Sequence, residues 1–275
     1  MKPPLMVRAA ALVLGLLATV PAFACANETG TNRYGREVYL RLPLADLRTE
    51  ITYDARRKGL VPWAQAVTRS AKKHPGFDTH NELAVALMRL GRPREAIRLL
   101  TVLEARHPGR YEIATNLGTA YELAGEDENA LQWIREGIRR NPRSHMGSEW
   151  IHVRILEAKV AGTVGTGSML GLDEVNAKLP KQSDLPAGNT GQPLDSDEVS
   201  LHLFAQLAER TQFVPPTDPV VASLFFDWAN LEMATGSLEV ADLAFEFAQR
   251  YGHPQKNLIG ARRARIAKAL GTRAG

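Results

Sequence analysis

Three polar residues near the middle of the chain have types and spacing that could do chemistry. His145, Glu149 and His152 are separated by four and then three positions, so on an α-helix their side chains project from one face over two turns. Two imidazoles and a carboxylate can bind zinc or act as a general acid and base. The group lacks the close His-x3-His pair of zinc protease helices and an identified fourth ligand. A metal-dependent enzyme is therefore one hypothesis, and a hydrogen-bonded core histidine at His152 is the alternative.

No other segment has a recognisable catalytic pattern. The loop Gly165-Thr166-Gly167 is not followed by the Gly-Lys-Ser/Thr of a phosphate-binding loop. The sequence also lacks the Gly-x-Ser-x-Gly turn of serine hydrolases. Cys25, the only cysteine, has no identifiable catalytic partner. We therefore expect a non-catalytic protein that requires no cofactor.

The composition is that of an ordinary folded chain of one or two domains. Of 275 residues, 44% are hydrophobic and 23% are charged, which is too apolar for a disordered chain and enough for a sizeable core. The net charge of +4 falls to +2 when Lys2 and Arg8 are left out. Such a balanced charge does not favour nucleic acid as a partner.

The first 24 residues have the three parts of a secretory leader. Lys2 and Arg8 stand at the front, an apolar run covers 9–20, and the small-x-small triplet Ala22-Phe23-Ala24 follows. An uncleaved membrane anchor is the alternative, but it needs about 20 uninterrupted apolar residues. We predict cleavage after Ala24. Arginine outnumbers lysine 25 to 9, as in GC-rich bacterial genomes, so we expect export to the periplasm or outer membrane.

Cys25 would become the first residue of the exported chain, where bacterial lipoproteins carry their lipidated cysteine. The preceding residues fit a lipobox only in part, because Ala24 matches while Ala22 and Phe23 are atypical. Lipidation of Cys25 is one interpretation, and a free or buried thiol is the other. Residues 25–42 are expected to form an N-terminal extension.

A repeat of 34 residues dominates the segment 77–144. Eight positions of the first copy recur in the second, where they are occupied by Leu117, Gly118, Tyr121, Gly125, Ala130, Ile134, Gly137 and Pro142. This pattern resembles the tetratricopeptide repeat, and it departs from that family mainly at Leu103, where a small residue is usual. The resemblance implies an all-α solenoid of helical hairpins, with repeats at 77–110 and 111–144 and a partial repeat at 145–160.

The flanking segments look like eroded copies of the same hairpin. Apolar spacing predicts a degenerate hairpin over 43–76 and a helix from about 144 to 159. Glycine and proline then indicate a flexible linker over 161–196. Within the C-terminal helical region 197–275, a repeat-like hairpin is expected at 219–252, followed by a basic helix at 255–270. Asp195 with Glu198, and Asp218 before Pro219, have the sequence of helix caps.

The resemblance implies that the first helix of each repeat lines a concave surface that binds a protein or peptide. The residues at these positions are Asp78, Asn81, Val85, Met88, Arg89, Glu112, Thr115, Thr119, Glu122, Glu149, Val153 and Glu157. Asn116 matches one position of the carboxylate clamp of chaperone-binding relatives. Asn81 and Met146 replace the lysines of that clamp, so a chaperone C-terminal peptide is not the expected ligand.

The C-terminal end is strongly basic. Residues 250–275 contain seven basic and no acidic side chains. A solvated terminal helix is one interpretation, and contact with anionic lipid or another acidic envelope component is the other.

Overall fold

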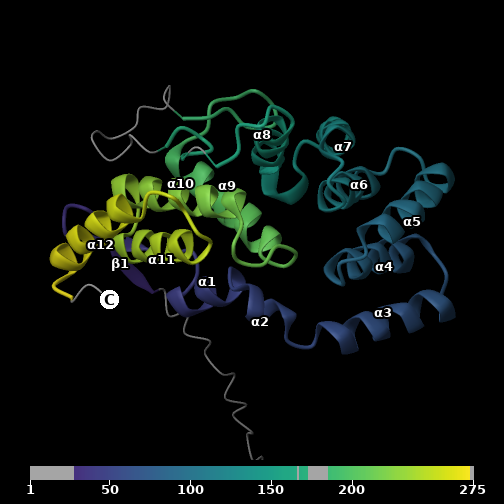
Figure 1. Ribbon diagram of the computed structural model, residues 1–275, viewed down its shortest axis with the longest axis horizontal. Coiled ribbons are helices and arrows are strands. Elements are labelled where there is room, and N and C mark those ends of the chain that lie inside the picture. The colour runs from purple at the N-terminus through teal and green to yellow at the C-terminus, as the bar shows by residue number, and fades with distance from the viewer. Residues whose placement is uncertain (1–27, 166, 173–184, 273–275) are drawn as a thin grey trace, which may run out of the picture.

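A computed structural model describes residues 28–165, 167–172 and 185–272. The expected leader, its cleavage site at Ala24 and the lipidation candidate Cys25 lie outside these residues. The described chain is predominantly helical, as expected, and its helices form a repeat array and a C-terminal body (Figure 1). Within the described ranges, no helix combines the length and apolar character needed to cross a bilayer.

The repeat array consists of paired antiparallel helices. Its elements are α3 (Leu60–Lys73), α4 (Phe77–Arg89), α5 (Pro93–Arg106), α6 (Tyr111–Leu123), α7 (Asp127–Arg140) and α8 (Glu149–Val160). The turns inside the two expected repeats use Gly91 and Gly125, whose φ angles of 74° and 78° lie in the left-handed region that glycine adopts without strain. The α4–α5 and α6–α7 hairpins therefore have the boundaries that the sequence predicts.

Small residues let the helices of the second repeat approach closely. A Cβ atom on Gly118 of α6 would lie 2.5 Å from the side chain of Ile134 on α7. A Cβ atom on Gly137 would likewise lie 2.6 Å from the methyl group of Thr115. Both distances are far below van der Waals contact, so these two glycines fix the distance between α6 and α7.

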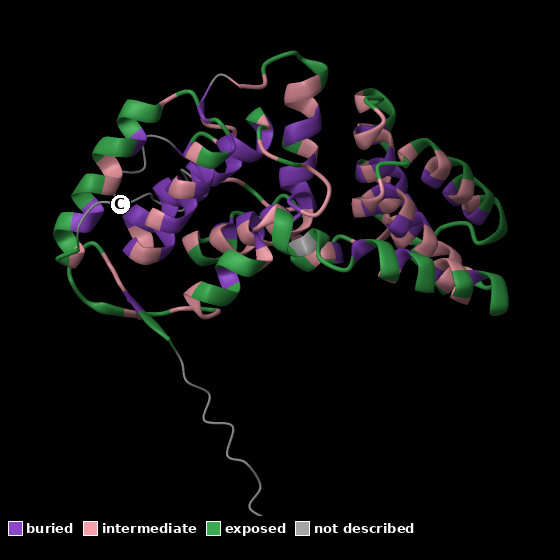
Figure 2. Cartoon of the chain, turned by 60° about the horizontal axis from the view of Figure 1, so that its bottom comes forward, coloured by how far each residue is buried: buried purple, intermediate pink, exposed green. Residues whose placement is uncertain are grey.

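The C-terminal body packs around one deeply buried helix. Its elements are α9 (Ser196–Arg210), α10 (Pro219–Thr235), α11 (Leu238–Arg250) and α12 (Lys256–Leu270). Every residue of α10 from Val220 to Ala234 is buried, and Figure 2 shows buried residues concentrated in this body. Asp195 and Glu198 form the expected capping box of α9, and Asp218 caps α10. The predicted hairpin over 219–252 is present as α10 and α11.

The prediction of a helical hairpin over 43–76 is wrong. This segment forms α1 (Leu44–Glu50), α2 (Tyr53–Arg57) and α3 in sequence, and it runs from the C-terminal body to the repeat array (Figure 1). Leu47 and Ile51 are buried in the C-terminal core, and Arg48 pairs with Glu246 of α11 at 2.7 Å. α3 instead packs against α4. Apolar periodicity showed which residues are helical, but not which partner each helix has.

The N-terminal extension is docked on the C-terminal body. Strands β1 (Thr29–Thr31) and β2 (Glu37–Tyr39) pair antiparallel, with Gly30 opposite Val38. The backbone N–H of Thr31 donates to the Glu239 carboxylate of α11 at 2.7 Å. These strands were not predicted from the sequence, because three residues are too short for a periodic pattern.

The described parts of the expected flexible linker are packed. Leu172 and Leu194 are buried in the C-terminal core. The buried carboxylate of Asp227 on α10 accepts hydrogen bonds from the backbone N–H groups of Met169 and Leu170, both at 2.8 Å, and from the hydroxyl of Ser168. A buried carboxylate requires such donors, so the prediction of a flexible linker is wrong for these residues.

Candidate functional site

The first helices of the repeats form an inner surface that borders a cavity. We define the inner surface as the described residues that line this cavity of about 160 Å³ from α4, α6 and α8, namely Val85, Met88, Asn116, Thr119, Glu122, Leu123, His152 and Lys159. Four of them, Val85, Met88, Thr119 and Glu122, were predicted as partner-binding residues. Asn116 also donates a hydrogen bond to Asn81 at 2.9 Å, so two neighbouring inner helices are joined on this side.

The opposite wall of the cavity comes from the C-terminal body. Gln206, Glu209 and Arg210 of α9 line it, together with residues of the α9–α10 loop, which we define as 211–218. In Figure 1 this loop extends from the end of α9 toward α4. The ring of Phe213 in the loop packs against the apolar cluster of α4, α5 and α6. The expected concave groove is therefore partly covered by the protein's own chain.

Glu122 is the electrostatic centre of the inner surface. Its two carboxylate oxygens accept hydrogen bonds from Arg210 at 3.0 and 3.2 Å. They also meet His152 at 2.7 Å and the ammonium of Lys159 at 2.8 Å. Burial disfavours the charged form, but the charges of Arg210, His152 and Lys159 outweigh it and hold the pKa of Glu122 well below its usual value. Glu122 is therefore ionised at neutral pH.

His145, Glu149 and His152 do lie together, as their spacing predicts. The Glu149 carboxylate is 1% exposed, and it accepts a hydrogen bond from Nδ1 of His145 and lies 3.3 Å from Nδ1 of His152. Burial would raise the pKa of Glu149, but the two histidines lower it to about 2. Burial would lower the pKa of His145, yet the hydrogen bond to Glu149 and the charge of Glu209 raise it to about 9. His145 and Glu149 therefore form an ion pair at neutral pH.

The metal hypothesis finds no support in this geometry. Both ring nitrogens of His152 face carboxylates, those of Glu149 at 3.3 Å and Glu122 at 2.7 Å, so both already have partners within the protein. Among the residues that the structure describes, no three His, Cys, Asp or Glu side chains are arranged to hold a metal ion. The alternative interpretation of His152 as a hydrogen-bonded core histidine describes its observed contacts.

His145 does not occupy the helix that the sequence predicts. Residues Ser144–Gly147 form a short 3-10 turn, η1, and α8 begins only at Glu149. His145 and Met146 have φ angles of 47° and 57°, a left-handed conformation that costs a non-glycine residue about 1 kcal/mol or more. The predicted helix over 144–159 is therefore too long at its start. The contact between His145 and Glu149 helps to hold this unfavourable backbone.

Several other residues predicted for the concave surface face neighbouring helices instead. The Thr115 side chain is buried beside Gly137 of α7, and Arg89 lies over the ring of Trp63 on α3. Val153 packs against the apolar cluster shared by α7 and α8, and Glu157 pairs with Arg135 of α7 at 2.8 Å. These four side chains therefore have contacts within the array, and their predicted contact with a partner remains a prediction.

The last two predicted positions lie near the starts of α4 and α6. Asp78 is exposed in the first turn of α4. Glu112 lies 3.2 Å from Arg110, close to the start of α6. Neither residue lines the cavity, so their predicted partner contact remains a prediction.

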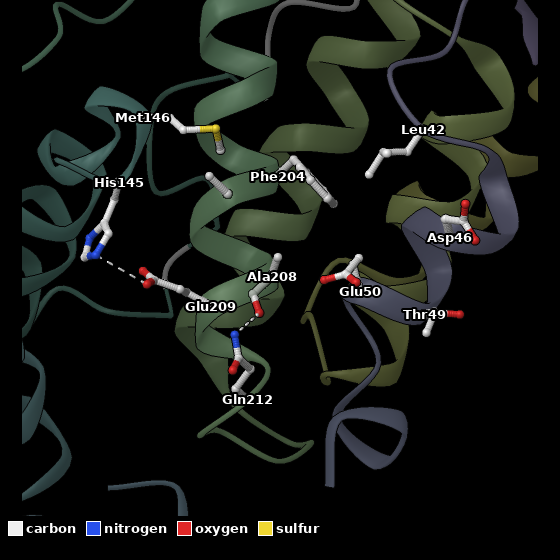
Figure 3. A pocket seen from close by; sticks show the side chains of 11 residues that line it. Leu42, Asp46, Thr49, Glu50, His145, Met146, Phe204, Ala208, Glu209 and Gln212 are labelled. Carbon is white, nitrogen blue, oxygen red and sulfur yellow. Dashed lines mark hydrogen bonds and ion pairs between the residues drawn. The ribbon is translucent and has the colours of Figure 1, made fainter. Parts of the chain in front are cut away.

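A second cavity lies on the other side of the end of α9. It has a volume of about 520 Å³, and Figure 3 shows the side chains of Leu42 and Glu50 pointing toward Phe204 and Ala208 of α9. His145 and Glu209 border both cavities. The His145 ring, whose Nε2 lies 3.6 Å from Glu209, therefore stands between the two.

Some basic residues of the terminal helix α12 contact other parts of the protein. Arg263 of α12 pairs with Asp242 of α11 at 2.7 Å, and Arg262 lies over the ring of Phe226. Lys256, Arg265 and Lys268 are exposed. Only the exposed residues of α12 are accessible to an external anionic partner.

Comparison with known families identifies the class to which the array belongs. Residues 81–145 match the model of the tetratricopeptide repeat family. The segment from Asn81 within α4 to His145 in η1 therefore consists of tetratricopeptide repeats. Domains of this class generally act as scaffolds that bind protein partners.

Two of the solved structures that are similar to this chain are tetratricopeptide repeat proteins. One is a thermophilic tetratricopeptide repeat protein of Thermus thermophilus, with 18% identity, a TM-score of 0.37, and coverage of 79% of this chain and 90% of that one. The other is a tetratricopeptide repeat protein of Parabacteroides merdae, with 18% identity, a TM-score of 0.32, and coverage of 83% and 99%. No curated protein gives a significant match.

Sequence reasoning missed Arg210 and Phe213. Arg210 meets Glu122 across 88 positions of sequence, and no local pattern encodes such a contact. Phe213 had a weak signal, because it is the aromatic residue of a short connection between two predicted helices and precedes Pro215 and Pro216. An aromatic ring in such a connection has no place in the stripe of either helix, so it needs another surface to pack on.

Proposed function

We propose that this protein is a non-catalytic interaction adaptor of the bacterial cell envelope, and that it binds a peptide or helix of a partner protein on the inner surface. The observation that carries the proposal is the composition of that surface, where the apolar side chains Val85, Met88 and Leu123 adjoin the ionised carboxylate of Glu122. A peptide with apolar side chains and a basic group can contact both the apolar area and the carboxylate of this surface.

The rigidity of the array supports this proposal. The close contacts at Gly118 and Gly137 fix α6 against α7, and the Asn116–Asn81 hydrogen bond joins α6 to α4. A surface that is already ordered loses little conformational entropy when a partner binds. Stacked hairpins of this kind can therefore bind a peptide without folding around it.

The proposed location rests on the sequence. The leader over 1–24 favours export, and Cys25 would then anchor the protein to a membrane if it is lipidated. Exposed Lys256, Arg265 and Lys268 on α12 supply positive charge for contact with anionic lipid, each worth about 1 kcal/mol near such a surface. We propose the periplasm or the outer membrane as the site of action.

A pair of matched threonine substitutions tests the binding surface. Thr119 lines the cavity on α6, whereas Thr101 is exposed on α5, and both hydroxyls donate to a backbone carbonyl four residues earlier. Thr119→Arg places a long cation on the inner surface, and Thr101→Arg adds the same side chain outside it. We expect affinity capture from envelopes of the native host to retain a partner with wild type and Thr101→Arg but not with Thr119→Arg. Equal capture by all three forms would refute the proposed surface.

A further inference from the structure

One cation, directly before the α9–α10 loop, contacts the inner surface. Arg210, the last residue of α9, is 8% exposed and forms a two-fold hydrogen bond with Glu122 of α6. Paired nitrogens and oxygens in this geometry give both strength and orientation. The guanidinium is thus a specific ligand of the acidic group on the inner surface.

The second contact is aromatic. Phe213 packs against the apolar cluster that contains Met88, Leu117 and Ala120, and it lines the cavity together with Met88. The backbone N–H groups of Phe213 and Val214 donate to the carbonyl of Arg210 at 3.0 and 2.9 Å. This turn fixes the ring relative to the guanidinium, so the two groups approach the inner surface as one unit.

The loop is also fastened to the C-terminal body by contacts that do not involve the Arg210 or Phe213 side chains. Asp218 caps α10, its backbone N–H donates to the carbonyl of Tyr251 at 3.1 Å, and the Tyr251 hydroxyl donates to the carbonyl of Val214 at 3.1 Å. Glu122 also keeps His152 and Lys159 when Arg210 is removed. The carboxylate would therefore remain compensated if another cation replaced Arg210.

We infer that the α9–α10 loop with Arg210 is an internal ligand of the inner surface, and that the external partner presents the same chemistry. That partner carries a basic side chain followed three residues later by an aromatic ring, on a turn or at a helix end. It binds by displacing Arg210 and Phe213 from Glu122 and the apolar cluster. This inference rests on the proposed function and specifies the partner for the same surface.

The protein's own sequence supplies the probe. A fluorescein-labelled peptide of residues 206–219 contains both groups, and a control peptide carries alanine in place of both. The full exported chain is compared as wild type and as the double variant Arg210→Ala/Phe213→Ala. A second double variant, Arg33→Ala/Tyr34→Ala, removes an exposed arginine and its aromatic neighbour from another part of the chain.

Fluorescence anisotropy should show saturable binding of the peptide to the Arg210→Ala/Phe213→Ala variant. Wild type and the Arg33→Ala/Tyr34→Ala variant should bind the peptide at least about 10-fold more weakly. In both proteins the tethered Arg210 and Phe213 compete with the peptide at an effective concentration of about 1 mM. The control peptide should not bind. If unfolding of the double variant prevents the measurement, Phe213→Ala alone keeps the ion pair and should show the same direction of change.

Equal binding by wild type and folded variant, or no binding by either, would overturn the inference. A wild-type dimer that is lost in Phe213→Ala would also overturn it, because the occupant would then be the loop of a second copy. These outcomes are distinct from failure of the proposed function. If Thr119→Arg still abolishes partner capture, the surface stands and only the chemistry assigned to its partner is wrong.

Discussion

Replacing Glu122 by glutamine tests whether the inner surface is held to the C-terminal body by charge. The substitution keeps the size of the side chain and removes the negative charge that Arg210, His152 and Lys159 share. Arg210 and His152 are both almost fully buried, so their charges lose compensation without gaining water. Removing one partner of a buried ion pair costs about 3–5 kcal/mol.

Two features of the site reduce that cost. Lys159 is more exposed than the others and lies 3.6 Å from Asp127, so it can turn to a second carboxylate or to water and its loss counts little. The glutamine carbonyl can still accept one hydrogen bond. We therefore expect Glu122→Gln to lower the free energy of unfolding by about 3 kcal/mol, which corresponds to a fall of roughly 6–12 °C in Tm for a chain of this size.

The assay is urea unfolding followed by circular dichroism, with Glu128→Gln as the control. Glu128 is an exposed residue in the first turn of α7, and its substitution should change the free energy by less than about 0.5 kcal/mol. The pKa of His152, followed by NMR, should also fall in Glu122→Gln, because the charge and hydrogen bond of Glu122 oppose the effect of burial. Equal stability of the two variants together with an unchanged His152 pKa would refute the reasoning.

Three further outcomes follow from the structure, and a fourth follows from the sequence. Gly118→Leu should overpack the contact with Ile134, where even a Cβ atom would lie at 2.5 Å, and lower thermal stability by about 1–3 kcal/mol; an unchanged melting curve would contradict the close helix approach. Because the folded-state pKa of His145 is raised from 6.5 to about 9, its stabilisation is complete below pH 6.5 and is lost as the pH rises to about 9. After allowance for its partial exposure, unfolding measured across that window should show a loss of about 1–3 kcal/mol that is smaller in His145→Gln. Asp227→Ala should leave the backbone N–H groups of residues 169 and 170 without their acceptor. Amide exchange at these two residues should then be faster, and the free energy of unfolding should fall by about 1–3 kcal/mol. Unchanged exchange there would disprove this anchoring role. If Cys25 is lipidated in the native host, the intact mass should rise by a diacyl or triacyl group and Cys25→Ser should move the protein from the detergent phase to the aqueous phase, whereas an unmodified mass would disprove lipidation.

Local sequence signals predicted the repeats and their caps because the physics behind them is local. Gly91 and Gly125 close the hairpins, and Asp195 and Asp218 cap the helices that they precede. A left-handed turn or an N-cap involves only neighbouring residues. The close contact at Gly118 is also local to one hairpin, because a Cβ atom there would lie 2.5 Å from Ile134.

The arrangement of the helices could not be read from the same signals. Leu47 and Ile51 form a stripe that fits several partners, and only the complete fold shows that it packs on the C-terminal core. The candidate site was half predicted for the same reason. Glu122 was identified from its position in the repeat. Its partner Arg210 lies 88 residues further along the chain, in a helix that does not follow the repeat pattern.

The position of partner contact tests the central claim most directly. A photo-crosslinking amino acid introduced at Val85, which lines the inner surface on α4, is compared with the same amino acid at Val102, which is 47% exposed on α5. Both proteins are expressed in the native host and irradiated in intact cells. The proposed function predicts a discrete crosslinked partner from position 85, lost in Thr119→Arg, and none from position 102. Equal crosslinking at both positions, or crosslinking at position 102 alone, would contradict the claim that the inner surface binds the partner.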